Sequence, residues 1–308
     1  MIPEGIGNVR IGTASWAEKT LLQSHAFYPP SVSSAEARLR YYARHFPIVE
    51  VDSAFYSVPS QETTHAWAER TPAGFRFGIK AFAAMTQHQF RLERLPAELR
   101  AMVPPDLLEE DRALYPRQVP DALVEGIWRL FRAAVTPLQA AGKLSYVLFQ
   151  MPKWFTPSAA NDRFLESLPQ RMPGVSIAVE FRAASWFTEQ RTARTLDLLR
   201  CHDLSYTCVD EPQGTPASVP PIAVVTSPRL SVVRFHGRRT EMWDRPGVST
   251  TERFGYLYPI DELRSWVPRV LELSEQASEV AVLMNNCYRE SAVRNAKDLA
   301  ELVLAARA

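Results

Sequence analysis

The stretch Ser176-Ile177-Ala178-Val179-Glu180-Phe181-Arg182 has an isoleucine, a valine and a phenylalanine in one phase, and the other phase ends in Glu180 and Arg182. Successive side chains on a β-strand point to opposite faces of the sheet. We therefore predict a strand with one face packed against apolar partners and charged groups at its carboxyl end.

Seven further runs have the length and composition of short strands, and helical patterns separate them. They are Arg10–Trp16, Ile48–Phe55, Phe75–Ala81, Leu144–Met151, Ser205–Asp210, Leu230–His236 and Glu279–Asn286. Eight such units favour a closed parallel barrel. We predict a single α/β domain over 1–308, a (β/α)₈ TIM-like barrel with its core over about 9–304. A doubly wound sheet is the alternative, but it usually carries a GxGxxG turn after its first strand, which is absent here.

The helical patterns have recognisable beginnings and apolar faces. Ser33 and Glu36 have the spacing of a capping box ahead of a helix at Ala37–Phe46. Apolar residues at helical spacing predict three more helices, at Ala122–Ala141, at Leu263–Leu273 and from Val293 to Val303.

The segment 91–121 is the longest irregular stretch of the chain, and it contains five prolines. It begins after the third predicted strand, and long loops in a compact domain often serve function. We predict a Pro-rich loop insertion that forms a lid or wall of a pocket at the carboxyl ends of the strands. A second Pro-rich loop, 212–221, follows the sixth strand on the same side.

Polar side chains share one phase along most of the strands. They are Glu50, Asp52, Arg76, Lys80, Gln150, Glu180, Arg182, Asp210, Arg234, His236, and Asn285 or Asn286. Most of them end their strands, and in a TIM barrel that rim is where active sites are built. The ordinary alternative is that the acids and arginines only neutralise one another. We favour a functional pocket, because desolvating so many charges is costly for a scaffold without a ligand.

Composition narrows the classes of partner. The formal net charge is +1, with 35 basic and 34 acidic residues, so binding to nucleic acid is not favoured. We find no signal peptide and no apolar run long enough to span a membrane, and the three cysteines form no CxxC pair. We therefore expect a cytoplasmic protein with reduced thiols and no membrane partner.

The histidines argue against zinc, because only His236 of the six ends a predicted strand and no HxH or HExxH spacing occurs. A single Mg²⁺ or Mn²⁺ held by Glu50, Asp52, Glu180 and Asp210 is left open, since hard cations prefer oxygen ligands. No other cofactor is expected.

Several of these motifs together resemble the YecE-like family, a domain of unknown function. The similar runs are Gly12-Thr13 with Trp16, Phe27-Tyr28-Pro29, Val49-Glu50-Val51-Asp52-Ser53-Ala54-Phe55-Tyr56, Phe77-Gly78-Ile79-Lys80, Leu148-Phe149-Gln150-Met151-Pro152, Val179-Glu180-Phe181-Arg182 with Ser185-Trp186, Val233-Arg234-Phe235-His236-Gly237-Arg238 and Asn285-Asn286. The resemblance implies a TIM-like barrel but no activity. Asp52 stands where the family usually has Asn. Thr86-Gln87-His88 replaces a Thr-His pair, so we assign no role to His88.

We predict an enzyme, a hydrolase, lyase or isomerase, that uses acid–base catalysis on a small or oligomeric anionic substrate, phosphorylated or sugar-like. Glu180 is the expected principal acid or base, with Glu50 or Asp210 as its partner. Substrate-binding roles are expected for Lys80, Gln150, Arg182, Arg234, His236, Asn285, Tyr56 and Trp186. A metal-assisted phosphodiesterase or nuclease and a metabolite-binding module without turnover remain as alternatives.

Glu180 also has an expected effect on stability. In a solvated ligand site, Glu180→Gln costs less than ~1 kcal/mol, whereas removing a buried counter-ion costs roughly 3–5 kcal/mol. From the sequence we expect the first result.

Overall fold

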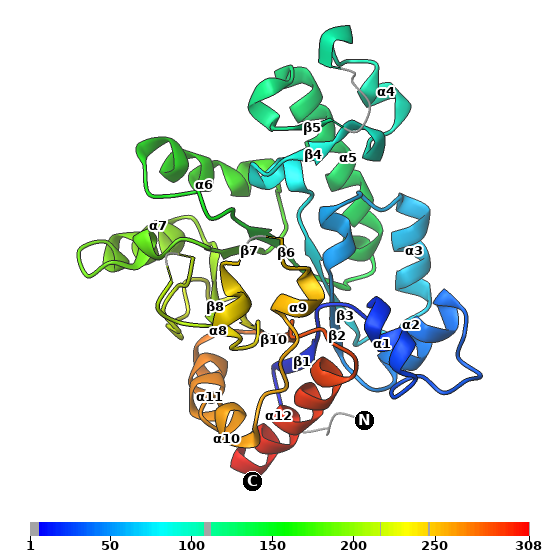
Figure 1. The fold of residues 1–308 in the computed structure, drawn as a ribbon, viewed down its shortest axis with the longest axis vertical. Coiled ribbons are helices and arrows are strands. Elements are labelled where there is room, and N and C mark those ends of the chain that lie inside the picture. Colours follow the sequence, from blue (N-terminus) through cyan, green and yellow to red (C-terminus); the bar gives the residue numbers. More distant parts are fainter. Residues whose placement is uncertain (1–5, 108–111, 216, 246, 308) are drawn as a thin grey trace.

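Eight parallel strands close into a barrel in the order β1-β10-β9-β8-β7-β6-β3-β2, as predicted (Figure 1). The computed structural model describes residues 6–107, 112–215, 217–245 and 247–307. The barrel strands are β1 (Val9–Thr13), β2 (Ile48–Val51), β3 (Arg76–Lys80), β6 (Leu144–Gln150), β7 (Ile177–Glu180), β8 (Ser205–Asp210), β9 (Ser231–Phe235) and β10 (Val280–Met284).

Most helices surround the strands on the outside of the barrel, while α8 (Thr240–Trp243) and α9 (Thr250–Arg253) lie over the carboxyl ends of the strands. Those on the outside are α1 (Lys19–Ser24), α2 (Ala35–Ala43), α3 (Gln61–Glu69), α5 (Asp121–Ala140), α6 (Ala159–Arg171), α7 (Thr192–Cys201), α10 (Ile260–Arg264), α11 (Val267–Gln276) and α12 (Ser291–Arg307). The connection from β8 to β9 breaks the pattern, because its described residues, 211–215 and 217–230, contain no helix.

Two predicted helices differ in detail. The predicted capping box of Ser33 and Glu36 is wrong. Ser34 is the N-cap of α2 and accepts a hydrogen bond from the backbone N–H of Ala37. The predicted helix Leu263–Leu273 is two helices, because α10 ends at Arg264 and α11 begins at Val267 with a proline in its first turn.

The insertion after β3 is more ordered than the irregular loop we predicted. Strands β4 (Phe90–Arg91) and β5 (Ala113–Leu114) pair antiparallel, and a short helix, α4 (Ala97–Arg100), lies between them in the chain. Single 3₁₀ turns occur at Leu92–Arg94, Pro105–Leu107 and Pro116–Gln118. In Figure 1 this segment extends beyond the barrel at the top of the view.

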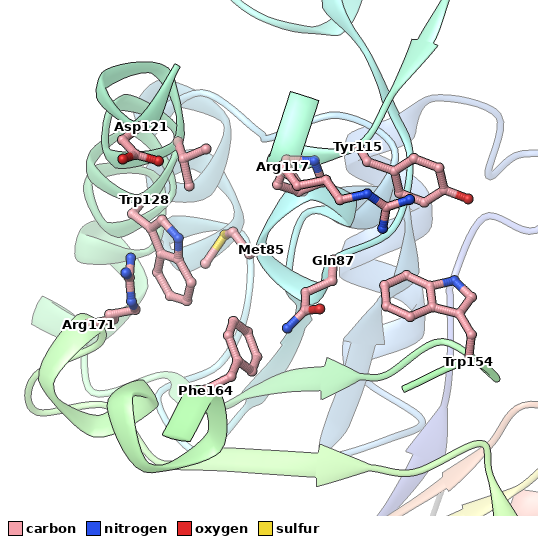
Figure 2. A pocket seen from close by; sticks show the side chains of 12 residues that line it. Met85, Gln87, Tyr115, Arg117, Asp121, Trp128, Trp154, Phe164 and Arg171 are labelled. Atoms are coloured by element: carbon pink, nitrogen blue, oxygen red, sulfur yellow. The ribbon is translucent and has the colours of Figure 1, made fainter. Parts of the chain in front are cut away.

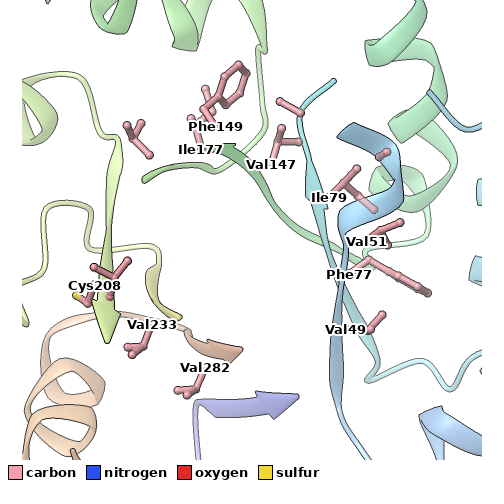
Figure 3. Packing of buried hydrophobic residues seen from close by; sticks show 14 of the residues in the cluster. Val49, Val51, Phe77, Ile79, Val147, Phe149, Ile177, Cys208, Val233 and Val282 are labelled. Carbon is pink, nitrogen blue, oxygen red and sulfur yellow. The ribbon is translucent and has the colours of Figure 1, made fainter. Parts of the chain in front are cut away.

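The predicted apolar phase faces the helices on most strands. Val49, Phe77, Val147 and Phe149 belong to the large buried cluster between strands and helices (Figure 3). The interior of the barrel holds a smaller apolar cluster of Ile48, Tyr146, Leu148, Ala178, Leu230, Val232, Ala281 and Leu283. Nearer the carboxyl ends of the strands, the interior of the barrel holds buried charged side chains, among them Glu50, Glu180 and Arg234.

Strand β8 has the opposite phase from the one we predicted. Val209 pairs with Arg234 and Asp210 pairs with Phe235, and paired residues in a parallel sheet point to the same face. Val209 therefore points into the barrel, while Cys208 and Asp210 point outward toward the helices. Figure 3 shows Cys208 in the outer apolar layer near Val233.

Gly78 is the point at which the fold makes room for the polar interior. A Cβ atom at this position would lie only 2.4 Å from the ring of Tyr146. Because glycine has no side chain, the Tyr146 ring can cross the interior there. Its hydroxyl donates a 2.8 Å hydrogen bond to Glu50.

Candidate functional site

A cavity of about 320 Å³ opens at the carboxyl ends of the barrel strands. Its wall is rich in cationic and aromatic side chains. The lining residues are Asp52, Phe55, Tyr56, Lys80, His88, Gln150, Met151, Pro152, Lys153, Arg182, Trp243, Arg253, Phe254 and Asn285. We call this space the central cavity. Five of the predicted site residues line it, namely Tyr56, Lys80, Gln150, Arg182 and Asn285.

A layer of buried charges lies below the central cavity, with Arg234 at its centre. Its guanidinium donates to Glu180 and to Glu50, each over 2.5 Å, and lies 3.5 Å from Asp52. The Arg234, Glu50 and Glu180 side chains have no exposed surface. Burial raises the pKa of Glu50 to about 7, although Arg234 opposes the rise. Arg234 therefore acts as a fixed bridge between two carboxylates, and none of the three lines the cavity.

Every oxygen of Glu180 is engaged. Besides Arg234, its carboxylate accepts from Gln150 at 2.7 Å and pairs with Arg182 at 2.7 Å. Burial alone would raise the pKa of Glu180, but Arg182 and Arg234 outweigh it and hold the pKa well below its usual range. The expectation that Glu180 lies in a solvated site is wrong, since the side chain is completely buried.

Glu211 is a second buried carboxylate beside Arg182, and it is not among the site residues predicted from the sequence. Its Oε2 lies 3.2 Å from Arg182, and its Oε1 accepts from the backbone N–H of Val219 in the β8–β9 connection. Burial raises the pKa of Glu211 to about 8, with Arg182 acting in the opposite direction. The residue directly follows a strand end, which is the only signal the sequence offered.

Glu211 predicts a pH dependence of stability. Because folding raises the pKa of Glu211, the native state keeps a proton on this carboxyl that the unfolded state has already lost. The free energy of unfolding therefore falls as the pH rises from about 4.5 to about 8. We expect Glu211→Gln to flatten this fall by roughly 2 kcal/mol or more, measured as urea midpoints between pH 5 and pH 9. Identical pH profiles for wild type and variant would contradict the assignment.

His236 is buried as a neutral ring. Burial first, and then Arg182, lower the pKa of His236 to about 3. The amide of Asn285 donates to Nδ1 over 2.9 Å, which leaves the ring proton on Nε2, 3.1 Å from Glu180. His236 does not line the central cavity. It orients Asn285, whose side chain does.

Lys80 and Asp52 are two charged groups that line the cavity and are incompletely paired. The ammonium of Lys80 lies 4.7 Å from the centre of the Phe55 ring and makes no hydrogen bond or ion pair within the described part of the chain. Burial lowers the pKa of Lys80, while the charge of Asp52 opposes this. Oδ1 of Asp52 is buried without a hydrogen bond. Such groups are rare in interiors and mark places where a ligand can bind.

His88 lines the central cavity, although the sequence alone predicts no role for it. The extra residue before it, Gln87, adopts a left-handed backbone conformation (φ 64°) that returns the chain toward the barrel. The Thr86 hydroxyl donates to Ala83, so it accepts from Nδ1 of His88 at 2.8 Å. Nε2 then keeps its lone pair. Burial, and next the charge of Lys80, lower the pKa of His88 to about 4.

Two predicted site residues lie elsewhere. Asp210 points outward and is held by Arg238, Tyr258 and Trp266, so its predicted role as a partner of Glu180 is wrong. Trp186 is fully buried, stacks on Phe155 at 5.6 Å and donates to its carbonyl, so its predicted contact with substrate is wrong as well.

The predicted lid also lies elsewhere. None of the described residues of 91–121 lines the central cavity. They line two neighbouring cavities, one of about 460 Å³ that includes Arg91 and Arg94 and one of about 280 Å³ that includes Tyr115 and Arg117.

The four carboxylates proposed for a magnesium or manganese ion do not meet. Glu50 and Glu180 are bridged by Arg234, and Asp210 lies on the other face of the sheet. Within the described residues, no group of three or more His, Cys, Asp or Glu side chains is placed to hold a metal ion. No helix in that part of the chain is long and apolar enough to cross a membrane.

The model of a family described as a protein of unknown function, DUF72, matches residues 10–308. The chain belongs to the DUF72 family. UPF0759 protein YunF of Bacillus subtilis is 32% identical over 298 residues, which cover 96% of this chain and 94% of YunF. UPF0759 protein YecE of Escherichia coli K12 is 28% identical over 172 residues, or 55% of this chain and 50% of YecE.

Solved DUF72 structures have the same fold as this DUF72 chain. A family protein from Enterococcus faecalis superposes with a TM-score of 0.76 at 25% identity, covering 96% of this chain and 95% of that one. One from Thermotoga maritima superposes with a TM-score of 0.73 at 27% identity, covering 96% and 98%. The predicted family and barrel are therefore confirmed.

Proposed function

We propose that this DUF72 protein is an enzyme that binds a small anionic substrate, phosphorylated or sugar-like, in the central cavity and transfers protons on it. One observation carries the proposal. Lys80, Lys153, Arg182 and Arg253 line the cavity together with a single acidic residue, Asp52. Lys80 and Arg253 make no ion pair with any described residue. An anionic ligand would supply the missing negative charge.

The positions of the other cations support a binding role for the rim. Arg182 is fixed by Glu180 and Glu211 and lies 5.1 Å over the ring of Trp243, so its orientation is set before a ligand arrives. A guanidinium held in this way presents its remaining donors without losing further side-chain freedom. Glu50 and Glu180 serve as counter-ions in this proposal rather than as the reacting acids.

Asp52 and His88 are the proposed proton-transferring groups. Both line the cavity that Lys80 and Arg182 share. The free lone pair on Nε2 of His88 can accept a proton from a bound substrate, and so can the carboxylate of Asp52, whose buried Oδ1 faces Arg234 at 3.5 Å. A base beside an anion-binding group can serve a hydrolase, lyase or isomerase reaction on an anionic substrate.

Binding is tested first with inorganic phosphate and sulfate by calorimetry. We expect Lys80→Gln to weaken binding at least ~10-fold, equivalent to about 1.4 kcal/mol, because the unpaired ammonium is lost. Lys19→Gln, a change at an exposed lysine outside the cavity, is the matched control and should bind as wild type does. Equal affinity of wild type and Lys80→Gln for both anions would refute the anion site.

Turnover is tested next with a panel of sugar phosphates and sugar acids, followed by NMR. For a converted substrate, we expect Asp52→Asn to lower kcat roughly 100-fold while affinity changes little. Retained anion binding without conversion of any panel member would favour the metabolite-binding alternative. Turnover that survives both Asp52→Asn and His88→Gln would contradict the proposed acid–base pair.

A further inference from the structure

A second cavity, of about 280 Å³, lies outside the rim between the insertion and helices α5 and α6. Its wall consists of Ala84, Met85, Gln87, Tyr115, Pro116, Arg117, Asp121, Val124, Trp128, Trp154, Phe164 and Arg171. None of these residues lines the central cavity. We call it the side cavity. It is separate from the site already described, although Gln87 and Trp154 are chain neighbours of His88 and Lys153.

Four aromatic side chains contribute to the wall of the side cavity, namely Tyr115, Trp128, Trp154 and Phe164. Figure 2 shows Trp128 and Phe164 on one side and Tyr115 and Trp154 on the other. Trp154 is 44% exposed, which is unusual for so large an apolar side chain, and its ring contacts Tyr115 edge to face at 6.1 Å. Rings on two sides of a narrow space favour a flat, apolar ligand.

The side cavity also presents two polar groups that the protein leaves unmatched. Arg117 stacks on Tyr115 at 4.4 Å but makes no hydrogen bond or ion pair with a described residue. Gln87 places its amide between the two aromatic sides in Figure 2, and none of its amide atoms is hydrogen-bonded in the described structure. A cation and an amide aimed at an apolar space suit a ligand with one charged end.

The other charges of the side cavity leave Arg117 as its free cation among the described residues. Arg171 lies 4.9 Å over the ring of Trp128 and is paired with Glu125 at 2.8 Å. Asp121 lies on the Trp128 side of the cavity, away from Tyr115 and Trp154 (Figure 2). A negative group would therefore bind on the Arg117 side.

Gln87 supports the same interpretation through its backbone. It has φ 64° at the end of the 3₁₀ turn Ala83–Thr86, a conformation that costs energy for a residue with a side chain. Strained residues of this kind are frequent where a side chain must be held toward a ligand. Gln87 has its side chain in the wall of the side cavity, and the next residue, His88, lines the central cavity.

We propose that the side cavity binds a planar aromatic molecule of one or two rings that carries a carboxylate or phosphate. The rings would lie between Trp128 and Trp154, and the anion would bind Arg117 with help from the Gln87 amide. The volume is near the lower end of the range for ligand pockets, which suits one or two rings better than a peptide or a long chain. This site is additional to the proposed enzyme site.

The test uses 2-naphthoate as an aromatic anion and 2-naphthol as its uncharged counterpart, titrated into the full-length protein by calorimetry. We expect one 2-naphthoate per chain, with affinity weakened at least ~10-fold by Arg117→Gln and also weakened by Trp154→Ala. Arg100→Gln, at an exposed arginine of the insertion outside the cavity, is the matched control and should have no effect. Arg117→Gln should leave the affinity for 2-naphthol unchanged.

Lys80→Gln separates this proposal from the enzyme site, because it changes the central cavity alone. We expect it to leave 2-naphthoate binding unchanged. Loss of 2-naphthoate binding in Lys80→Gln, with normal binding in Arg117→Gln, would place the ligand in the central cavity and overturn the proposal. Unchanged affinity in both Arg117→Gln and Trp154→Ala would overturn it too, and so would the absence of measurable binding. Since both variants alter exposed side chains, misfolding is not expected, and far-ultraviolet circular dichroism checks this.

Discussion

Glu180→Gln is expected to lower the free energy of unfolding by about 3–5 kcal/mol, because it removes the negative charge shared by the fully buried Arg234 and the largely buried Arg182. Arg234 would keep Glu50 and the more distant Asp52, and Arg182 would keep Glu211. Such a loss is a large fraction of the 5–15 kcal/mol that holds a typical domain folded. The result would identify Glu180 as a counter-ion that fixes the floor of the central cavity.

Urea midpoints at pH 7 measure this cost. Glu189→Gln is the matched control, since Glu189 is an exposed glutamate in the turn before α7 and should change stability by less than ~0.5 kcal/mol. Because the pKa of Glu180 is held low in the folded protein, the wild type gains its stabilisation above the ordinary carboxyl pKa and loses it as the pH falls. The difference between wild type and Glu180→Gln should therefore shrink toward pH 3. A difference in the free energy of unfolding below ~1 kcal/mol at pH 7 would contradict the assignment of Glu180 as a buried counter-ion and would indicate a solvated side chain.

The alternation of side chains predicted which residues converge, but not how deep they lie. Glu50, Glu180 and Arg234 share the interior phase with Lys80 and Gln150, as the sequence pattern indicated. Whether an inward residue reaches solvent depends on its height along the strand and on the side chains above it. Arg182, two residues further along the chain, lies between Glu180 and the cavity and removes that carboxylate from solvent. No local pattern contains this information.

The errors at Asp210 and Trp186 have a different origin. In β8 both phases are largely uncharged, so the sequence pattern does not determine the direction of Asp210, and the register places this side chain outward. Trp186 belongs to the 3₁₀ turn Ala184–Phe187, which directs the indole onto Phe155 outside the barrel. His88 was left out because its spacing differed by one residue, which the left-handed Gln87 accommodates. Each outcome depends on a turn or a contact between distant segments.

Asp210 remains important in the structure, and its replacement gives the second large expected effect. Its carboxylate accepts from Arg238 at 2.8 and 2.6 Å, from Tyr258 at 2.8 Å and from the Trp266 indole at 2.6 Å. These donors come from the β9 rim and from the segment around α10 and α11, so one carboxylate ties both to the end of β8. An asparagine has one acceptor oxygen in place of two, and its NH₂ group would face a donor.

We expect Asp210→Asn to lower the free energy of unfolding by about 3 kcal/mol, because buried donors, one of them charged, lose their acceptor. Asp197→Asn, which breaks the exposed pair with Arg200, should cost under ~1 kcal/mol and is the matched control. The decisive comparison is with ligand binding. Because Asp210 does not line the central cavity, folded Asp210→Asn should bind phosphate within about twofold of wild type, whereas Lys80→Gln should not. Loss of phosphate binding at unchanged stability would show instead that Asp210 acts on the ligand and that β8 presents its other face to the barrel.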